Sequence, residues 1–251
     1  NAVGLTGTKG IDGLLQGSRW DFGSGPRVLT YSFTVNDSSN GGPWSARPDI
    51  MSQVRVALDA WAAVANISFV EVGGGGVFLN STADLAITLT GNELLTAFGA
   101  VGLAAFPSSV FATSFRQSTG YTAAQYPNPE GDIFFDNSYK DYNNVSSGRI
   151  GFYYLLHETG HALGLKHPSD DGFNSRPTFA QLGLSSVDAT NFTVMSNNLS
   201  QGVSNSTSLN PTTPMILDIL AIQQLYGANM SYHTGDDVYT LGLSTKTIWD
   251  A

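Results

Sequence analysis

The stretch HETGHALGLKHP, residues 157–168, decides how the rest of the sequence is interpreted. Three of the four histidines of the chain fall inside it, at His157, His161 and His167. On an α-helix with 3.6 residues per turn, the first two lie about 40° apart around the axis and about 6 Å apart along it. Both imidazoles can therefore reach one ion, and Glu158 lies beside them.

The third histidine needs a different explanation. A continued helix would turn His167 about 80° away from His157 and about 120° away from His161. We expect the helix to stop at Gly164, because glycine enters the left-handed conformation that ends many helices without steric cost. Pro168 then prevents the helix from resuming. A lone HExxH pair also fits two hydrogen-bonded core histidines, but the added glycine and third histidine favour a zinc site.

The composition limits the possible classes of protein. With 251 residues, 41% of them apolar, the chain can bury a sizeable core as one large domain or two lobes. Its net charge of -9 argues against a nucleic-acid or anionic-membrane partner. Without cysteines, neither disulfides nor thiolate metal ligands are possible. The longest apolar run, residues 97–106, is too short to span a bilayer, so no membrane span is expected.

Hydrophobic periodicity predicts a mixed sheet with one long helix. Apolar residues recur from Ile50 to Ala65 at spacings of four, four, three and four, which predicts an amphipathic helix starting near Pro48. The segment 150–163 is apolar nearly all round, so the helix with the first two histidines is expected to be buried, with a close neighbour at Gly160. Short alternating or apolar runs predict strands at residues 28–33, 67–72, 85–89, 102–106 and 132–135.

The histidine stretch resembles a known family signature. HExxHxxGxxH matches the metzincin zinc peptidases, and the wording of the whole stretch looks most like the serralysin branch. The segment 193–196, TVMS, resembles the methionine turn of that family, with Met195 as the methionine. Further similarities are the N-terminal entry at 14–33, the first long helix around 57–61, and a closing helix at 218–229 with Pro214 at its first position and Gly227 past its end.

This resemblance implies an α+β fold, the zincin-like catalytic domain of metzincins. We expect a twisted mixed β-sheet with a long helix and an active-site helix, and a smaller C-terminal lobe with the methionine turn and closing helix. The expected boundaries are 1–229 for the domain, with an upper lobe 1–164 and a lower lobe 165–229, and 230–251 for a tail with a strand-like segment at 237–241. The calcium-binding repeats of serralysins do not occur in the sequence, so we expect them to be cleaved, omitted or missing.

The resemblance also implies a function, that of a secreted, extracellular zinc endopeptidase acting on proteins or peptides, expected as a monomer. His157, His161 and His167 would hold one zinc ion, leaving a position for a water whose pKa falls to about 7. Glu158 would be the general base toward that water and pass its proton to the leaving amine. Met195 would form an apolar floor under the histidines. Substrate would bind along an edge strand, the alternative being a paired interior strand; its residues are Gly102, Leu103, Ala104, Ala105 and Phe106.

Asn197 is a departure from the serralysin pattern. Serralysins have a tyrosine at this position, which binds zinc at rest and donates a hydrogen bond to the reacting carbonyl, so that role is not carried over. Related matrixins work without this ligand. The alternative function is a catalytically silent, zinc-bearing binding or adhesion module. Asp170 and Asp171 are interpreted as a polar turn, with a calcium ion as a less specific alternative, and His233 as a solvated loop histidine.

Overall fold

The centre of the molecule is a five-stranded mixed sheet with the strand order β2-β1-β3-β5-β4. The computed structural model describes residues 1–35, 41–91, 95, 98–200, 209–240 and 247–250. Neighbouring strands are parallel except at the edge, where β4 runs antiparallel to β5. Each predicted strand of the sheet is found within two residues of its expected ends, and the strands are β1 Val28–Val35, β2 Ser68–Glu71, β3 Leu85–Thr90, β4 Gly102–Ala104 and β5 Ile133–Asp136.

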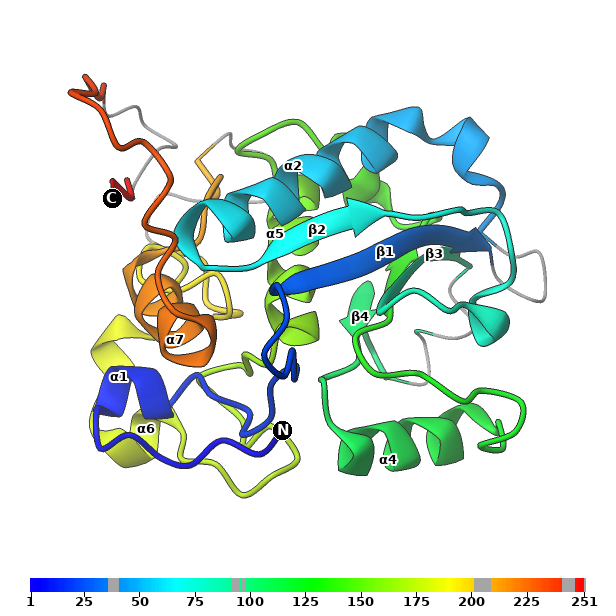
Figure 1. Cartoon of the computed structure of the whole chain (residues 1–251), viewed down its shortest axis with the longest axis horizontal. Helices are drawn as coiled ribbons and strands as arrows, with labels where there is room; N and C mark the ends of the chain where they lie inside the picture. Colours follow the sequence, from blue (N-terminus) through cyan, green and yellow to red (C-terminus); the bar gives the residue numbers. More distant parts are fainter. Residues whose placement is uncertain (36–40, 92–94, 96–97, 201–208, 241–246, 251) are drawn as a thin grey trace.

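Two long helices, α2 and α5, pack on each other and contact the sheet (Figure 1). Helix α2, Pro48–Val64, has the predicted start and buries the predicted apolar stripe. Helix α5, Ile150–Ala162, is buried along nearly its whole length, as its uninterrupted apolar sequence predicts. The indole N–H of Trp61 on α2 donates to the carbonyl of Leu156 on α5, at 3.1 Å. This contact fixes the histidine-bearing helix against the longest helix of the fold.

Helix α4, Ser109–Thr119, was not predicted from the sequence. Its signals were nevertheless present, because the Ser108 hydroxyl accepts from the N–H of Phe111 at its start and Gly120, in the left-handed conformation, ends it. Phe111 and Phe115 lie four residues apart on its buried face. They join a second apolar cluster, which also contains Phe78, Tyr126 and Phe134.

The N-terminal segment lies beside the C-terminal helices. Helix α1, Lys9–Asp12, contacts α6, Phe179–Leu182, and α7, Ile216–Tyr226 (Figure 1). The predicted position of Pro214 is wrong, because α7 is capped by Met215, whose N–H donates to the Asp218 carboxylate at 2.8 Å, and Pro214 precedes that cap. The helix ends at Gly227, with φ of +80°, as expected. The remaining short turns are the 3-10 helices η1 Trp44–Ala46, η2 Phe78–Asn80, η3 Lys140–Asn143 and η4 Ser185–Val187.

The predicted strand-like segment at 237–241 is wrong over its described part. Residues 237–240 form no strand, and residue 241 lies outside the described residues. Val238 is 95% exposed, so the alternating pattern there buries nothing against a sheet. Trp249 holds the end of this tail, its indole N–H donating to the carbonyl of Asn229 at 3.0 Å. Within the described ranges, no helix combines the length and apolar character that crossing a membrane requires.

Candidate metal centre

Helix α5 delivers two histidines and then ends where the sequence predicts. Its last residue is Ala162, and Gly164 follows with φ of +106°. A side chain at Gly164 would also place its Cβ 2.5 Å from the carbonyl oxygen of Ser18. Position 164 therefore requires glycine twice, for its conformation and for the close approach of the N-terminal segment. The reversal lets His167 return toward the helix.

The three imidazoles meet at their Nε2 atoms. The distance from His157 Nε2 to His161 Nε2 is 3.1 Å, and His167 Nε2 lies 3.0 Å from each of them. The Nδ1 atoms point outward to acceptors, His157 to Val194 O at 2.7 Å and His161 to Leu165 O at 2.7 Å. With a proton on each Nδ1, the Nε2 lone pairs converge on one point.

This donor set fits a zinc ion. Three lone pairs facing one another repel unless a cation lies between them, and zinc binds imidazole nitrogen at about 2.0–2.1 Å. Burial lowers the pKa of His157 to about 3, with the neighbouring His167 adding to the shift. Burial also lowers the pKa of His161 well below its usual value. Both imidazoles are therefore neutral at neutral pH, which is the form that binds metal.

Glu158 lies next to the histidines and against the edge strand. The backbone N–H of Ala104 donates to its carboxylate, and burial raises the pKa of Glu158 to about 8. A Cβ at Gly102 would lie 2.8 Å from the Glu158 Oε1 atom and 2.9 Å from its Cγ. The sequence assigned Gly102 to a substrate strand only, and the structure adds that its missing side chain makes room for this carboxylate.

The methionine turn packs beneath α5. A Cβ at Gly160 would lie 2.5 Å from the sulfur of Met195, which explains the glycine inside the helix and confirms the expected close neighbour. The turn is tied down by Asp218, whose carboxylate accepts from the Thr193 hydroxyl at 2.5 Å and from the Val194 N–H at 2.7 Å. Since the Val194 carbonyl accepts from His157, Asp218 orients this histidine indirectly. The sequence assigned Asp218 to the closing helix without a role at the site.

His167 is held by side chains that the sequence did not single out for this role. Its Nδ1 lies 2.5 Å from Asp170 Oδ2, a pairing typical of metal-bound histidines. Burial of Asp170 acts to raise its pKa, but the hydrogen bond and charge of His167, the N–H of Gly172 and the charge of Lys166 together outweigh it, and the pKa lies below the usual value. The signal was an aspartate three residues after a ligand histidine, in what is, as predicted, a polar turn. The calcium alternative at this turn stays a prediction.

Lys166 also stabilises the loop that carries His167. Its side chain is fully buried, and its ammonium donates to the carbonyls of Gly13 at 2.7 Å, His167 at 3.0 Å and Asp170 at 2.8 Å. Burial lowers the pKa of Lys166 to about 8. One side chain thus joins the N-terminal segment to the loop that carries the third histidine.

The predicted substrate strand lies at the edge of the sheet. Ala105 exchanges backbone hydrogen bonds with Gly131 and Asp132, and the carbonyl of Val101 accepts from Asp136. Because such bonds alternate along an antiparallel strand, Leu103 and Ala105 face β5, whereas Gly102 and Ala104 direct their backbone groups away from it, where the Ala104 N–H meets Glu158. Strand β4 ends at Ala104, so Phe106 lies beyond it, with its ring centroid 5.3 Å from that of His161.

Two other singled-out residues lie outside the cluster. Asn197 is exposed and follows the buried Ser196. His233 stacks on Tyr232 with ring centroids 4.1 Å apart and lies 3.6 Å from Asp237, in the tail.

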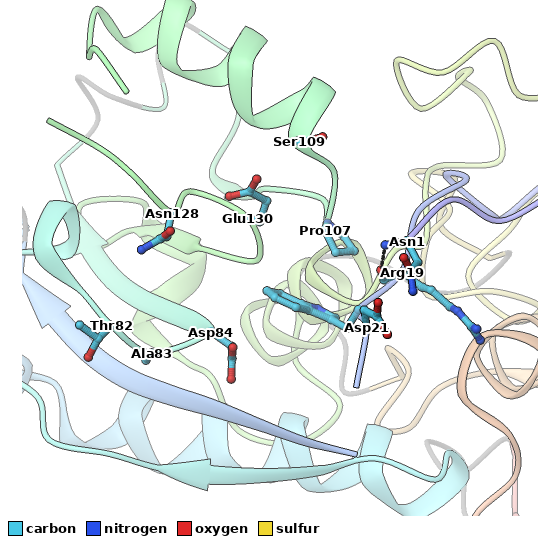
Figure 2. A pocket seen from close by; sticks show the side chains of 11 residues that line it. Asn1, Arg19, Asp21, Thr82, Ala83, Asp84, Pro107, Ser109, Asn128 and Glu130 are labelled. Atoms are coloured by element: carbon cyan, nitrogen blue, oxygen red, sulfur yellow. Dashed lines mark hydrogen bonds between the residues drawn. The ribbon is translucent and has the colours of Figure 1, made fainter. Parts of the chain in front are cut away.

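A separate polar cavity of about 610 Å³ opens between the N-terminal segment, the start of β3 and the approach to α4. Figure 2 shows its walls, with Arg19 and Asp21 on one side and Asn128 and Glu130 on another. None of the three histidines lines it, so it is distinct from the metal centre.

Comparison with known proteins identifies the family. Residues 23–189, about two thirds of the chain, match the matrixin family. Serralysin B of Dickeya chrysanthemi is 30% identical over 227 residues, which cover 86% of this chain and 42% of that protein. Serralysin of Proteus mirabilis is 30% identical over 229 residues, covering 88% and 44%. Metallopeptidase AprA of Pseudomonas marginalis is 29% identical over 236 residues, covering 89% and 45%.

The chain therefore spans less than half the length of these curated relatives. The match to the family includes α5 and all three histidines, and the relatives extend the likeness over most of the chain. Together with the mixed sheet and the histidine cluster, this shows that the chain belongs to the matrixin family and is a serralysin-like metzincin.

Proposed function

We propose that this chain is a zinc-dependent endopeptidase that uses Glu158 as its general base. The observation that carries the proposal is the meeting of three features at one place. Three histidine Nε2 atoms converge within 3.1 Å of one another, a buried carboxylate lies beside them, and an open strand edge borders that carboxylate. When bound to the histidines, zinc supplies Lewis-acid polarisation of a carbonyl and lowers the pKa of water.

Glu158 is suited to moving a proton in both directions. A general base works best when its pKa lies near the working pH, and burial raises the pKa of this carboxyl to about 8. Its carboxylate takes the proton from the attacking water and returns it to the leaving amine. The N–H of Ala104 and the space left by Gly102 fix its position during both transfers.

The substrate is a protein or peptide bound in extended form along β4. The outward backbone groups of Gly102 and the carbonyl of Ala104 pair with the peptide main chain, which adds a strand to the edge of the sheet, while the Ala104 N–H stays bonded to Glu158. Leu103 and Ala105 support the strand from the β5 side. This arrangement brings the peptide main chain next to Glu158, where cleavage takes place.

The remaining elements of the proposal concern the setting of the enzyme. It is secreted, acts outside the cell as a monomer, and does not bind nucleic acid. The likeness to serralysins supports the first point and the net charge of -9 supports the last. The catalytic domain comprises residues 1–229, with lobes 1–164 and 165–229, and residues 230–251 form the tail.

A second candidate function is a catalytically silent, zinc-bearing binding module. It is favoured by Asn197, which stands where serralysins have a tyrosine and is exposed. Both candidates predict stoichiometric zinc, and only the endopeptidase predicts cleavage.

The test measures zinc content and hydrolysis of an unfolded casein-like protein on the same preparation. The wild-type chain is expected to hold one zinc ion and to cleave. Glu158→Gln keeps the size of the side chain and removes the base, so we expect it to retain zinc and to lose activity by about 10²- to 10⁴-fold. Stoichiometric zinc without cleavage by the wild type would refute the endopeptidase and favour the binding module.

A further inference from the structure

A ladder of aromatic rings leads from the metal centre to the surface. The ring of Phe106 meets His161 edge-on at 5.3 Å between centroids and meets Phe111 at 5.0 Å. Phe111 in turn contacts Phe173 at 5.4 Å. Phe106 and Phe111 are buried, whereas Phe173 is 72% exposed. The row of rings is therefore buried next to the histidines and exposed to solvent at its outer end, Phe173.

The backbone of Phe173 has a conformation that is unfavourable for a bulky residue. Its φ of +57° lies in the left-handed region, which a bulky side chain rarely adopts. The Asp171 carboxylate accepts its N–H at 3.0 Å and keeps the backbone in place. Strain of this kind persists only where the surroundings impose it, and it concentrates at sites that bind ligands. A strained residue that also exposes its ring contributes little to the core.

The position of these rings indicates which ligand would contact them. Phe106 follows β4, the strand along which the proposed substrate lies, so the ladder starts where the bound peptide leaves the sheet edge. Three ring steps of about 5 Å correspond to no more than about five residues of an extended chain.

We propose that Phe173 is a specificity-determining residue, whose ring, backed by Phe111, receives an apolar side chain of the peptide substrate within about five residues of the cleaved bond. This inference rests on the proposed endopeptidase function and assigns its substrate class. Apolar and aromatic side chains gain from burial against these rings, whereas a carboxylate there would lose hydration without a partner.

The test compares peptides that differ at one position only. A peptide library first locates any position where wild type prefers Leu or Phe to Asp, and a matched pair is then made for that position. Phe173→Asn removes the ring and suits the left-handed backbone. We expect it to lower kcat/KM for the apolar peptide by about tenfold, through KM, and to leave the Asp peptide unchanged. Phe173→Tyr should retain the preference.

Val238→Asn provides the matched control, since it removes an exposed apolar side chain from the tail, and its preference should equal that of the wild type. If wild type cleaves no peptide, the proposed function fails. If it cleaves but shows no apolar preference, or keeps that preference in Phe173→Asn, only the specificity proposal fails. A change of oligomeric state in Phe173→Asn with the preference intact, seen by light scattering, would instead identify an interface between copies and overturn the proposal.

Discussion

The two halves of the histidine cluster are built in different ways. His157 and His161 come from one buried helix, and their Nδ1 atoms face backbone carbonyls. His167 comes from a loop, its side chain is 27% exposed, and its Nδ1 faces a side-chain carboxylate. A helix sets the spacing of its residues by its own geometry. A loop does not, so the position of His167 depends on contacts spread over Gly164, Lys166 and Asp170.

The largest expected effect comes from breaking the junction between the two halves. In Gly164→Ala the new Cβ would be attached to a left-handed backbone and would lie 2.5 Å from the carbonyl oxygen of Ser18, so the chain must move. We expect a loss of about 3 kcal/mol or more in the free energy of unfolding, with weaker zinc binding. Urea unfolding of the metal-free chain and a chelator competition measure the two effects.

Gly120→Ala is the matched control for this change. Gly120 ends α4 with φ of +78°, and a Cβ there would meet no atom within 4 Å. Only the conformational cost of about 1–2 kcal/mol remains. Equal losses in the two variants would mean that the approach of Ser18 contributes nothing and that the junction is set by backbone conformation alone.

Lys166→Met tests the loop half by itself. It keeps an apolar stem and leaves the carbonyls of Gly13, His167 and Asp170 without their donor. We expect about 2 kcal/mol of lost stability, because buried acceptors without partners are costly, and a melting temperature lower by about 4–8 °C. Lys9→Met, at an exposed position, should change neither. A melting temperature unchanged in Lys166→Met would show that water replaces the ammonium.

The same contrast explains what could be predicted from the sequence. The two helical histidines follow from periodicity and from a spaced motif, because local geometry determines them. Met195 follows from the resemblance of residues 193–196 to the methionine turn of metzincins. The strands follow from short apolar runs for the same reason. Gly164 was also predictable, since a helix end and a change of direction leave few residue choices.

The missed features depend on contacts between distant segments. Lys166 reaches Gly13, and Asp218 reaches Val194, across more than twenty residues of sequence in each case. No periodicity in the sequence indicates such pairs. In the sequence, a lysine or aspartate that becomes buried cannot be distinguished from an exposed one, because its partners are brought to it only by the fold. Helix α4 is different, because its caps Ser108 and Gly120 and the apolar residues between them are close together in the sequence and need no distant partner to be recognised.

The smallest expected effect concerns the single hydrogen bond that distinguishes the loop histidine from the helical pair. Asp170→Asn keeps the shape of the side chain but removes the charge that faces His167 Nδ1 at 2.5 Å. Changes in such partners weaken metal binding by about 10- to 100-fold, and we expect a loss in this range with little change in stability. Asp171→Asn, one residue away and bonded to the N–H of Phe173, should leave zinc affinity unchanged. If both variants bind zinc as tightly as the wild type, His167 is placed by Lys166 and the loop backbone alone, and the two halves of the site then differ only in where their histidines are anchored.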